Sequence, residues 1–317
     1  MKQRIVFFLG AILLFATLSR GQTWNMTPTM TAILDSKGVL TISTIKSGGE
    51  AMPEKTMTWY KVQANKIVSV LIEYGVTTIS PRAFAEFKFL TNVTIPNSVT
   101  MIGYNAFYGC NSLSSVIIPN SVISIGVSVF ERCTNLVTVT IGNSVTSIGN
   151  SAFEKCTSLT FITIPNSVTT IGENAFYECS SLTSVTISNS ITTIEKSTFS
   201  NCSNLTSIII PNSVTNIKSW AFYECNGLTS VMIPKSVTNI GNVAFYPCNA
   251  LKDVIVGWEI PPKGAFDDTK YYLSPDVFDW EKTHAMTLYV PKGTKALYQV
   301  AAYWKEFGTI IENINHE

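Results

Sequence analysis

One spacing governs the middle of this chain, because residues of the same type recur every 23 positions. All seven cysteines follow the period, at Cys110, Cys133, Cys156, Cys179, Cys202, Cys225 and Cys248. Phenylalanines follow it too, at Phe84, Phe107, Phe130, Phe153, Phe176, Phe199, Phe222 and Phe245. A fixed period in the range of about 20–50 residues indicates a solenoid, in which each small unit buries its apolar face against its neighbours. We therefore expect a long, regular surface rather than an enclosed catalytic pocket.

Each unit predicts two short strands. The pattern is Leu-x-x-Val-x-Ile-Pro-Asn-Ser-Val-Thr-x-Ile-Gly-x-x-Ala-Phe-x-x-Cys-x-x, as in residues 159–181. Apolar and polar residues alternate at 182–187, which predicts a strand that the proline position ends, because proline has no N–H for the ladder. Gly142 and Ser188 replace that proline in two units and should change little. A second extended stretch is predicted at 168–171, and the residues up to Cys179 are too few for more than one helical turn. Eight units stacked at about 4.8 Å make a solenoid roughly 40 Å long.

The cysteines are best interpreted as core residues. Seven is an odd number, and their spacing equals the repeat, so each coil places one small apolar thiol in the same interior position. Neighbouring coils bring the sulfurs close enough for disulfides to be conceivable, but side chains in register point the same way rather than at each other. We expect free, buried thiols.

The repeat resembles a known family. Its pattern Ile-Pro-Asn-Ser-Val-Thr-x-Ile-Gly-x-x-Ala-Phe-x-x-Cys-x-x-Leu is similar to the leucine-rich repeats of the BspA-like bacterial surface proteins, over residues 67–254. The resemblance implies a right-handed leucine-rich-repeat solenoid of the α/β horseshoe class, rich in β-structure, that is exported or displayed at the surface. It also implies adhesion to host proteins and cells, with the ligand bound at positions that vary between members.

The flanks are predicted to be caps, at 22–66 and 255–317, since the end coils of a solenoid expose apolar faces. A hairpin is expected around 35–38, and the stretch around Trp59 and Tyr60 resembles the family's lead-in. Beyond the repeats we predict a strand at 287–290, a turn with a helix N-cap at 291–294, a helix over 295–307 and a final strand at 309–311.

Residues 1–21 are predicted to be a secretory signal. Lys2 and Arg4 precede an apolar stretch, and a small-x-small cleavage site follows at 19–21. A membrane anchor is the alternative, but it needs about 20 apolar residues and this run is shorter. No second run could span a bilayer, so the mature chain should begin near Gln22 and be secreted or held at the cell surface, with the periplasm as an alternative.

The net charge of +1 gives no basic footprint, which excludes nucleic acid as a partner.

Catalytic chemistry is not indicated. Residues 76–250 contain no His and no Asp, and general acid–base catalysis needs such groups within reach of one substrate atom. The C-terminal flank does combine carboxylates with a histidine, at Asp267, Asp268, Asp276, Asp279, Glu281 and His284. A metal site or a glycosidase pair is one interpretation, but no ligand spacing supports it, and turn-forming aspartates in a solvated loop explain the group. We predict no catalytic residue, metal or cofactor.

Residues that depart from their row in the repeat are candidate binding residues. On the strand face, Phe161 interrupts a polar row, and Ile117, Ile209 and Met232 interrupt a row of threonines. Exposed apolar residues of this kind can anchor a partner, although β-branched residues also simply suit a sheet.

Equivalent positions in the predicted loop of each unit supply the second set of candidates. Trp220 stands where other units have mainly Asn or Ser, and Tyr177, Tyr223 and Tyr246 directly follow a core phenylalanine. Aromatic rings suit contacts with protein or sugar, or they simply cover neighbouring coils. A row of threonines at 77, 100, 146, 169, 192, 215 and 238 predicts a cross-coil ladder, with an ice-like array as the alternative.

Three functional hypotheses follow. The first is an exported, non-catalytic, adhesin-like scaffold that binds an extracellular or host protein. The second is a glycan-binding accessory protein of the cell envelope. The third is an enzyme that uses His284 in the C-terminal flank.

Overall fold

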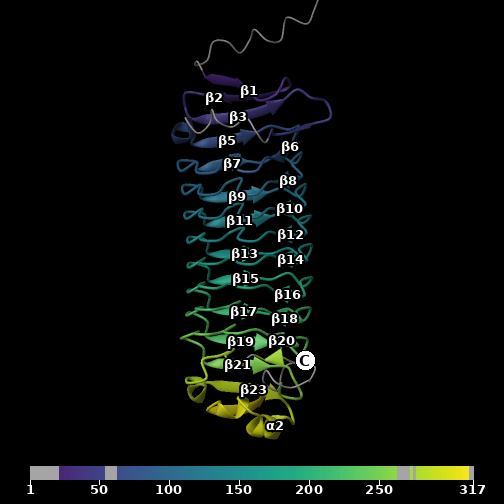
Figure 1. Ribbon diagram of the computed structural model, residues 1–317, viewed down its shortest axis with the longest axis vertical. Coiled ribbons are helices and arrows are strands. Elements are labelled where there is room, and N and C mark those ends of the chain that lie inside the picture. The colour runs from purple at the N-terminus through teal and green to yellow at the C-terminus, as the bar shows by residue number, and fades with distance from the viewer. Residues whose placement is uncertain (1–20, 54–62, 263–271, 274–275, 314–317) are drawn as a thin grey trace, which may run out of the picture.

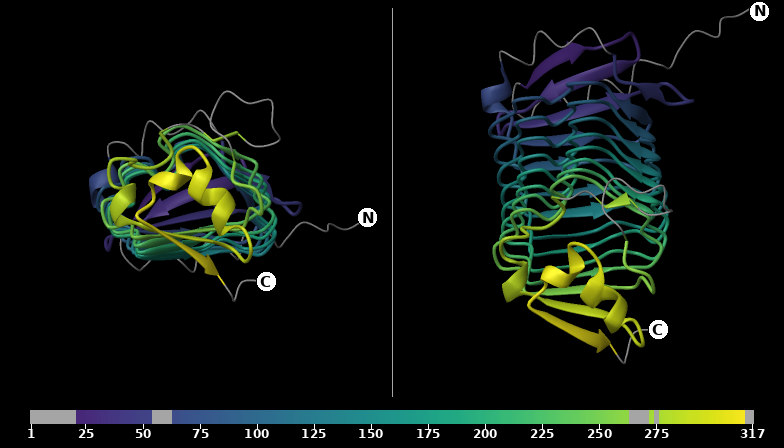
Figure 2. Two further views of the ribbon diagram at one scale, coloured as in Figure 1. Left: turned by 90° about the horizontal axis from the view of Figure 1, so that it is seen from below. Right: turned by 60° about the horizontal axis from the view of Figure 1, so that its bottom comes forward.

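The protein is a column of stacked coils (Figure 1). The computed structural model describes residues 21–53, 63–262, 272–273 and 276–313. Seen from its end, successive coils superpose as one flattened loop (Figure 2). The chain therefore forms the predicted β-rich solenoid, and the expected signal, the stretch around Trp59 and the pair Asp267 and Asp268 lie outside the described residues.

The first strand of each coil forms a parallel ladder along one side of the column. Its strands are β5 (Ser69–Ile72), β7 (Asn92–Thr94), β9 (Ser115–Ile118), β11 (Thr138–Ile141), β13 (Phe161–Thr163), β15 (Ser184–Thr186), β17 (Ser207–Ile209), β19 (Ser230–Ile233) and β21 (Asp253–Val256). Register follows the period, so Ser115 lies beside Thr138 and Ser207 beside Ser230. The predicted strand at 182–187 is confirmed but shorter. We call the outward side of this ladder the strand face.

A second ladder of shorter strands runs along another side. It consists of β6 (Val76–Ile79), β8 (Met101–Ile102), β10 (Ser124–Ile125), β12 (Ser147–Ile148), β14 (Thr170–Ile171), β16 (Thr193–Ile194), β18 (Asn216–Ile217), β20 (Asn239–Ile240) and β22 (Tyr272–Leu273). Gly149 follows β12 because any Cβ there would lie 2.7 Å from the backbone of Gly126 in the previous coil. Such glycines let the coils approach each other closely.

Threonine side chains reinforce the second ladder. Thr169 Oγ1 donates to the carbonyl of Thr146 over 3.2 Å, and Thr215 Oγ1 donates to the carbonyl of Thr192 over 3.2 Å. Both bonds join residues 23 positions apart. The predicted cross-coil threonine ladder is confirmed.

The third side of each coil consists of turns rather than a helix; we call it the turn face. The N–H groups of Asn105 and Phe107 donate to the next coil, at Val127 O and Val129 O, over 2.9 Å each. The intervening N–H groups close turns within the coil, as Ala106 N does on Gly103 O. This alternation comes with a left-handed backbone at two positions of most coils, the second of them at residues such as Lys155, with a φ of 60°. At the first position, φ lies between 50° and 57° at Arg82, Asn105, Ser128, Ser151, Asn174, Ser197 and Val243. Trp220 shares the position with a φ of 60°.

Phenylalanine and cysteine fill the core. Neighbouring phenylalanine rings stack with centroids 5.4 Å apart for Phe107 and Phe130, and the stack continues beyond the repeats from Phe245 to Phe278 at 5.6 Å. Every cysteine is free and buried, which confirms the prediction. Each thiol donates to the phenylalanine carbonyl of the previous coil, as Cys133 Sγ does to Phe107 O over 3.1 Å. Burial raises the pKa of the Cys133 and Cys248 thiols to about 12.

The N-terminal end carries a hairpin. Strands β1 (Gln22–Asn25), β2 (Met30–Leu34) and β3 (Val39–Thr44) pair in antiparallel fashion, and β3 then pairs in parallel with β5, so the first ladder begins before the repeats. Asp35 makes the expected turn, because its Oδ1 accepts from the N–H groups of Lys37 and Val39 over 2.8 and 2.9 Å. Strand β4 (Glu50–Ala51) pairs with β6, and the 3₁₀ turn η1 (Ala64–Lys66) precedes β5.

The C-terminal end extends the first ladder and covers it. The strands predicted at 287–290 and 309–311 are confirmed as β23 (Thr287–Pro291) and β24 (Thr309–Asn313). They continue the parallel order from β21. The 3₁₀ turn η2 (Thr283–Ala285) precedes β23. In Figure 2 the yellow helical turns of the C-terminal segment cross the end of the column.

The single helix predicted over 295–307 is wrong. Helix α2 (Lys295–Val300) ends after six residues, Ala301 is extended, and the 3₁₀ turn η3 (Trp304–Glu306) follows a left-handed Tyr303. The break turns Trp304 into the core, where its Nε1 donates to Pro262 O over 2.9 Å. Thr294 is the N-cap residue, yet its side chain does not cap the helix and instead donates to Pro291 O over 2.7 Å.

Candidate functional site: strand face and turn face

The predicted strand-face residues point outward but do not form one cluster. Phe161 on β13 is 51% exposed, and Ile117 on β9 is 68% exposed. They occupy different rows, and the polar coil of β11 separates them, with Thr138 and Thr140 exposed. Each is therefore an isolated apolar contact on a polar surface.

Ile209 and Met232 belong to a longer stripe. Ile209, 76% exposed, lies beside Met232, which lies beside Ile255. The row continues onto the C-terminal strands through Tyr289 to Ile311. Met232, Ile255 and Tyr289 are half-buried, and Ile311 is exposed. We call these five residues the apolar stripe; they line five adjoining strands of one sheet.

Sequence reasoning found only the first part of this stripe. Tyr289 follows Ile255 by 34 positions and Ile311 follows Tyr289 by 22, so the 23-residue alignment does not reach them. The alternation at 287–290 was the available signal, because it fixes which residues of that strand face outward. The strand pairing supplies the missing register.

The predicted aromatic residues gather on the turn face. Tyr223 N donates to Trp220 O over 3.1 Å within one turn, and Trp220 N donates to Asn242 O of the next coil over 3.0 Å. Tyr246 follows in that next coil, and it and Trp220 are each 38% exposed. Tyr177 and Tyr223 are half-buried. The structure therefore places Trp220, Tyr223 and Tyr246 on two adjoining turns, with Tyr177 two coils before Tyr223.

Trp220 has an unusual backbone for its size. Its φ of 60° lies in the left-handed region, where Asn is tolerated and bulky side chains are strained by roughly 1–3 kcal/mol. Lys196 holds the ring, with its Nζ 4.8 Å from the ring centroid, a cation–π contact between neighbouring coils.

Carboxylates adjoin the tyrosines. A hydrogen bond from the Tyr223 hydroxyl to Glu224 raises the pKa of Tyr223, with burial as a further cause. Burial and a hydrogen bond to Glu178 raise the pKa of Tyr177. Lys155 lies between the coils, with Nζ 3.8 Å from Glu154 and 3.9 Å from Glu178. The turn face here combines rings with hydrogen-bond acceptors.

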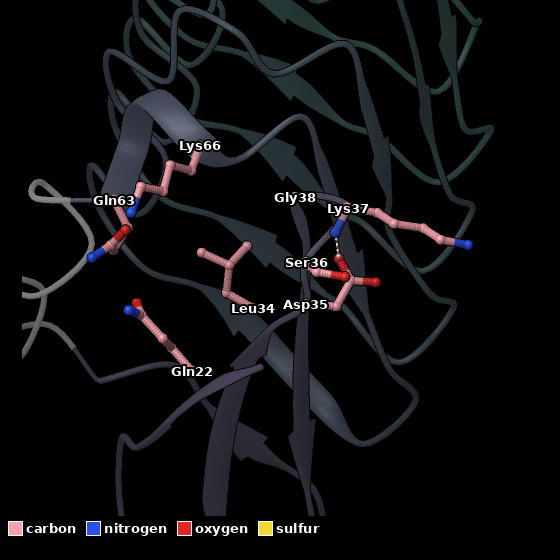
Figure 3. A pocket seen from close by; sticks show the side chains of 8 residues that line it. All are labelled: Gln22, Leu34, Asp35, Ser36, Lys37, Gly38, Gln63 and Lys66. Carbon is pink, nitrogen blue, oxygen red and sulfur yellow. Dashed lines mark hydrogen bonds between the residues drawn. The ribbon is translucent and has the colours of Figure 1, made fainter. Parts of the chain in front are cut away.

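Two shallow depressions lie on the surface of the described residues. One, of about 430 Å³, lies against the N-terminal hairpin, where Asp35 is bonded to its own turn and Lys37 points away from the other lining residues (Figure 3). The other, of about 450 Å³, lies beside β12 and β14, where Asn150 Oδ1 accepts from Glu173 N over 3.0 Å. The first depression also contains Gln63, whose buried Oε1 has no hydrogen-bond partner among the described residues, and the second also contains the side chains of Glu173 and Glu195.

The polar residues of the C-terminal flank do not converge. Asp279 is buried and pairs with Lys282 over 3.0 Å, whereas Glu281 and His284 are exposed. Within the part of the chain that the structure describes, no group of His, Cys, Asp and Glu side chains is placed to hold a metal ion. The same residues include no helix long and apolar enough to cross a membrane.

Comparison with known proteins identifies the repeat. A sequence profile of the BspA type leucine rich repeat region matches six copies, over residues 58–182 and 169–270. The chain belongs to the BspA-type leucine-rich repeat family. The predicted resemblance is confirmed, and the family is consistent with a scaffold for protein interactions. No curated protein matches the chain.

One solved structure shares the fold, and two others are similar in sequence. A leucine-rich repeat protein from Bacteroides ovatus is 24% identical, with a TM-score of 0.62 over 91% of this chain and 76% of that protein. A leucine-rich repeat protein from Eubacterium ventriosum is 23% identical, with a TM-score of 0.48 over 92% and 85% of the two chains. The leucine-rich repeat protein of T. pallidum is also 23% identical, with a TM-score of 0.47 over 73% and 87%.

Proposed function

We propose that this protein is an exported, non-catalytic scaffold that binds an extracellular protein of a host or its matrix through the strand face. The observation that carries the proposal is the apolar stripe, which begins at Ile209 and ends at Ile311. A row of apolar side chains that stays exposed or half-buried on adjoining strands can mark an interaction surface. Ile209 is the most exposed residue of the stripe, because Met232, Ile255 and Tyr289 are half-buried.

The surroundings of the stripe favour protein recognition. The row beside it carries Ser207, Ser230, Asp253 and Thr287, in register with the stripe strands. An apolar centre beside a polar border is the usual arrangement of a protein interface, in which a few central residues contribute most of the affinity. Phe161 and Ile117 are proposed as secondary contacts on the same face.

A binding assay with a double variant tests this function. Wild type should bind at least one of a panel of immobilised matrix proteins in surface plasmon resonance, and Ile209→Ser with Met232→Ser should weaken that binding about tenfold or more. Leu71→Ser is the matched control, because Leu71 is exposed on the same ladder at the other end of the column. Equal binding by wild type and the double variant would exclude the stripe as the anchor.

Export is the second part of the proposal. Lys2 and Arg4 before an apolar stretch support a signal that is cleaved near Gln22. Expression of the full chain followed by intact-mass measurement of the exported protein tests it. A mass that retains the first 21 residues would contradict cleavage at this position.

A further inference from the structure

A second surface lies on the turn face, away from the strand face. We call Trp220, Tyr223 and Tyr246 the aromatic platform. Backbone hydrogen bonds fix their positions, because Tyr223 N donates to Trp220 O over 3.1 Å and Tyr246 N donates to Val243 O over 3.3 Å. Trp220 N bonds to Asn242 O of the coil that carries Tyr246. The rings therefore belong to two adjoining turns of one rigid face.

The backbone of Trp220 shows that packing alone does not explain this residue. Most equivalent left-handed positions carry Asn or Ser, such as Asn105 and Asn174, while Arg82 and Val243 share the conformation. Trp220 accepts the strain and still leaves its ring 38% exposed. Strained residues held by a rigid surrounding are concentrated at functional sites. The exposed indole of Trp220 is therefore interpreted as a binding group.

The groups around the rings can form hydrogen bonds with the hydroxyls of a ligand. Glu224 adjoins the Tyr223 hydroxyl and raises its pKa. Asn242 is exposed on the following coil, and its backbone carbonyl accepts from Trp220 N. Lys196 fixes the indole from the preceding coil, with its Nζ 4.8 Å from the ring centroid. The platform thus offers flat apolar rings bordered by a carboxylate, an amide and an ammonium group.

We propose that the aromatic platform binds a neutral oligosaccharide. The C–H faces of pyranose rings can stack on Trp220 and Tyr246, while Glu224 and Asn242 bond sugar hydroxyls. Trp220 and Tyr246 lie on neighbouring coils, which are about 4.8 Å apart, so a short chain of sugar units can reach both rings. The carboxylate of Glu224, with that of Glu178 nearby on the same face, disfavours acidic sugars by like-charge repulsion. This site does not rest on the protein-binding function proposed for the strand face.

The test uses the mature chain, isothermal titration calorimetry and Trp220→Asn. The probes are cellohexaose, maltohexaose, mannohexaose and chitohexaose, with hexagalacturonic acid as the anionic comparison. Wild type should bind at least one neutral probe, and Trp220→Asn should weaken that binding about tenfold or more. The same variant should melt at a higher temperature than wild type, because Asn relieves the left-handed strain. That combination distinguishes loss of a contact from loss of the fold.

Two controls separate this site from the rest of the surface. Tyr104→Ala removes an exposed ring that also has a cationic neighbour, Arg82, 5.9 Å from its centroid, and it should leave sugar binding unchanged. Ile209→Ser with Met232→Ser should also leave it unchanged. The proposal is overturned if no neutral probe binds, if Trp220→Asn binds as wild type does, or if the acidic probe binds best. Loss of a protein partner in Trp220→Asn without any sugar binding would assign the platform to protein recognition instead.

Discussion

Single residues explain why seven cysteines can remain unpaired in this fold. Each thiol is buried and donates to a carbonyl of the previous coil, over 3.1 Å for Cys110 and 3.4 Å for Cys248. A thiol that is both buried and hydrogen-bonded acts as a small core side chain with no exposed nucleophile. The period therefore reflects a repeated packing position.

Thiol accessibility tests this role directly. A disulfide-exchange reagent should react with none of the cysteines in the folded chain at pH 8 and with all seven in denaturant. Burial both blocks access and raises the thiol pKa, so folded-state reaction should require unfolding. Counting fewer than seven thiols after unfolding without reductant would reveal disulfides and contradict the prediction.

The raised thiol pKa also predicts loss of stability in alkali. An unfolded cysteine has a pKa of about 8.5, whereas that of folded Cys133 is about 12. Stability is therefore full below about pH 8.5 and falls as pH rises towards 12, because only the unfolded chain releases the proton there. Each such thiol should steepen the fall by about 1.4 kcal/mol per pH unit.

Denaturant unfolding between pH 8 and pH 10 measures this dependence. Cys133→Ala should be less stable than wild type at pH 7.5 because it leaves a cavity, yet its stability should fall less steeply with pH. Parallel pH dependences for the two proteins would show that the Cys133 thiol is already accessible to deprotonation in the folded state.

Among the elements, the C-terminal segment depends most on one side chain. Trp304 is fully buried in η3, its Nε1 bonds to Pro262 O, and its ring contacts Tyr298 with centroids 5.6 Å apart. Tyr298 in α2 in turn donates to Trp258 O over 2.7 Å. The short helix is thus held by tertiary contacts rather than by its own length.

Replacing Trp304 should release this segment. Trp304→Ala should cost about 3–5 kcal/mol of unfolding free energy, and Trp304→Phe should cost less because it keeps most of the packing and loses the hydrogen bond. Hydrogen exchange should show faster exchange in β23 and β24 for the alanine variant. Unchanged protection there would mean that the strands do not need this cover.

The contrast between repeats and flanks shows what periodicity can predict. The strands, the buried Phe153 and Cys156 and the threonine ladder follow from sequence, because each position is repeated in the same environment. The left-handed backbone at Lys155 recurs at the equivalent Gly109 and Asn201, but the lysine itself gives no signal, since it does not favour that conformation. The break at Tyr303 is set by Trp304 entering the core, and the reach of the stripe to Ile311 depends on strand pairing outside the period. Non-repeated contacts carry no pattern to detect.

At the scale of the whole molecule, each coil contacts only its neighbours, so interfaces should be interchangeable. The ring stack makes this concrete, with centroids 5.5 Å apart for Phe130 and Phe153 and 5.4 Å apart for Phe153 and Phe176. The thiol bonds repeat in the same way, at 3.2 Å from Cys156 to Phe130 and from Cys179 to Phe153. Stability of such an array is close to a sum over units and their interfaces.

Removal of one coil in phase should therefore leave a folded, shorter column. Deleting 136–158 places Leu159 where Leu136 was and lets Phe176 stack on Phe130, so every core position keeps its partner type. Cooperative thermal unfolding should persist, and small-angle scattering should show a column shorter by about 4.8 Å. Deleting 141–151 instead shifts the period, turns apolar positions outward and should abolish cooperative unfolding. Failure of both variants alike would mean that the coils are individually adapted to their neighbours and that the period is not a unit of folding.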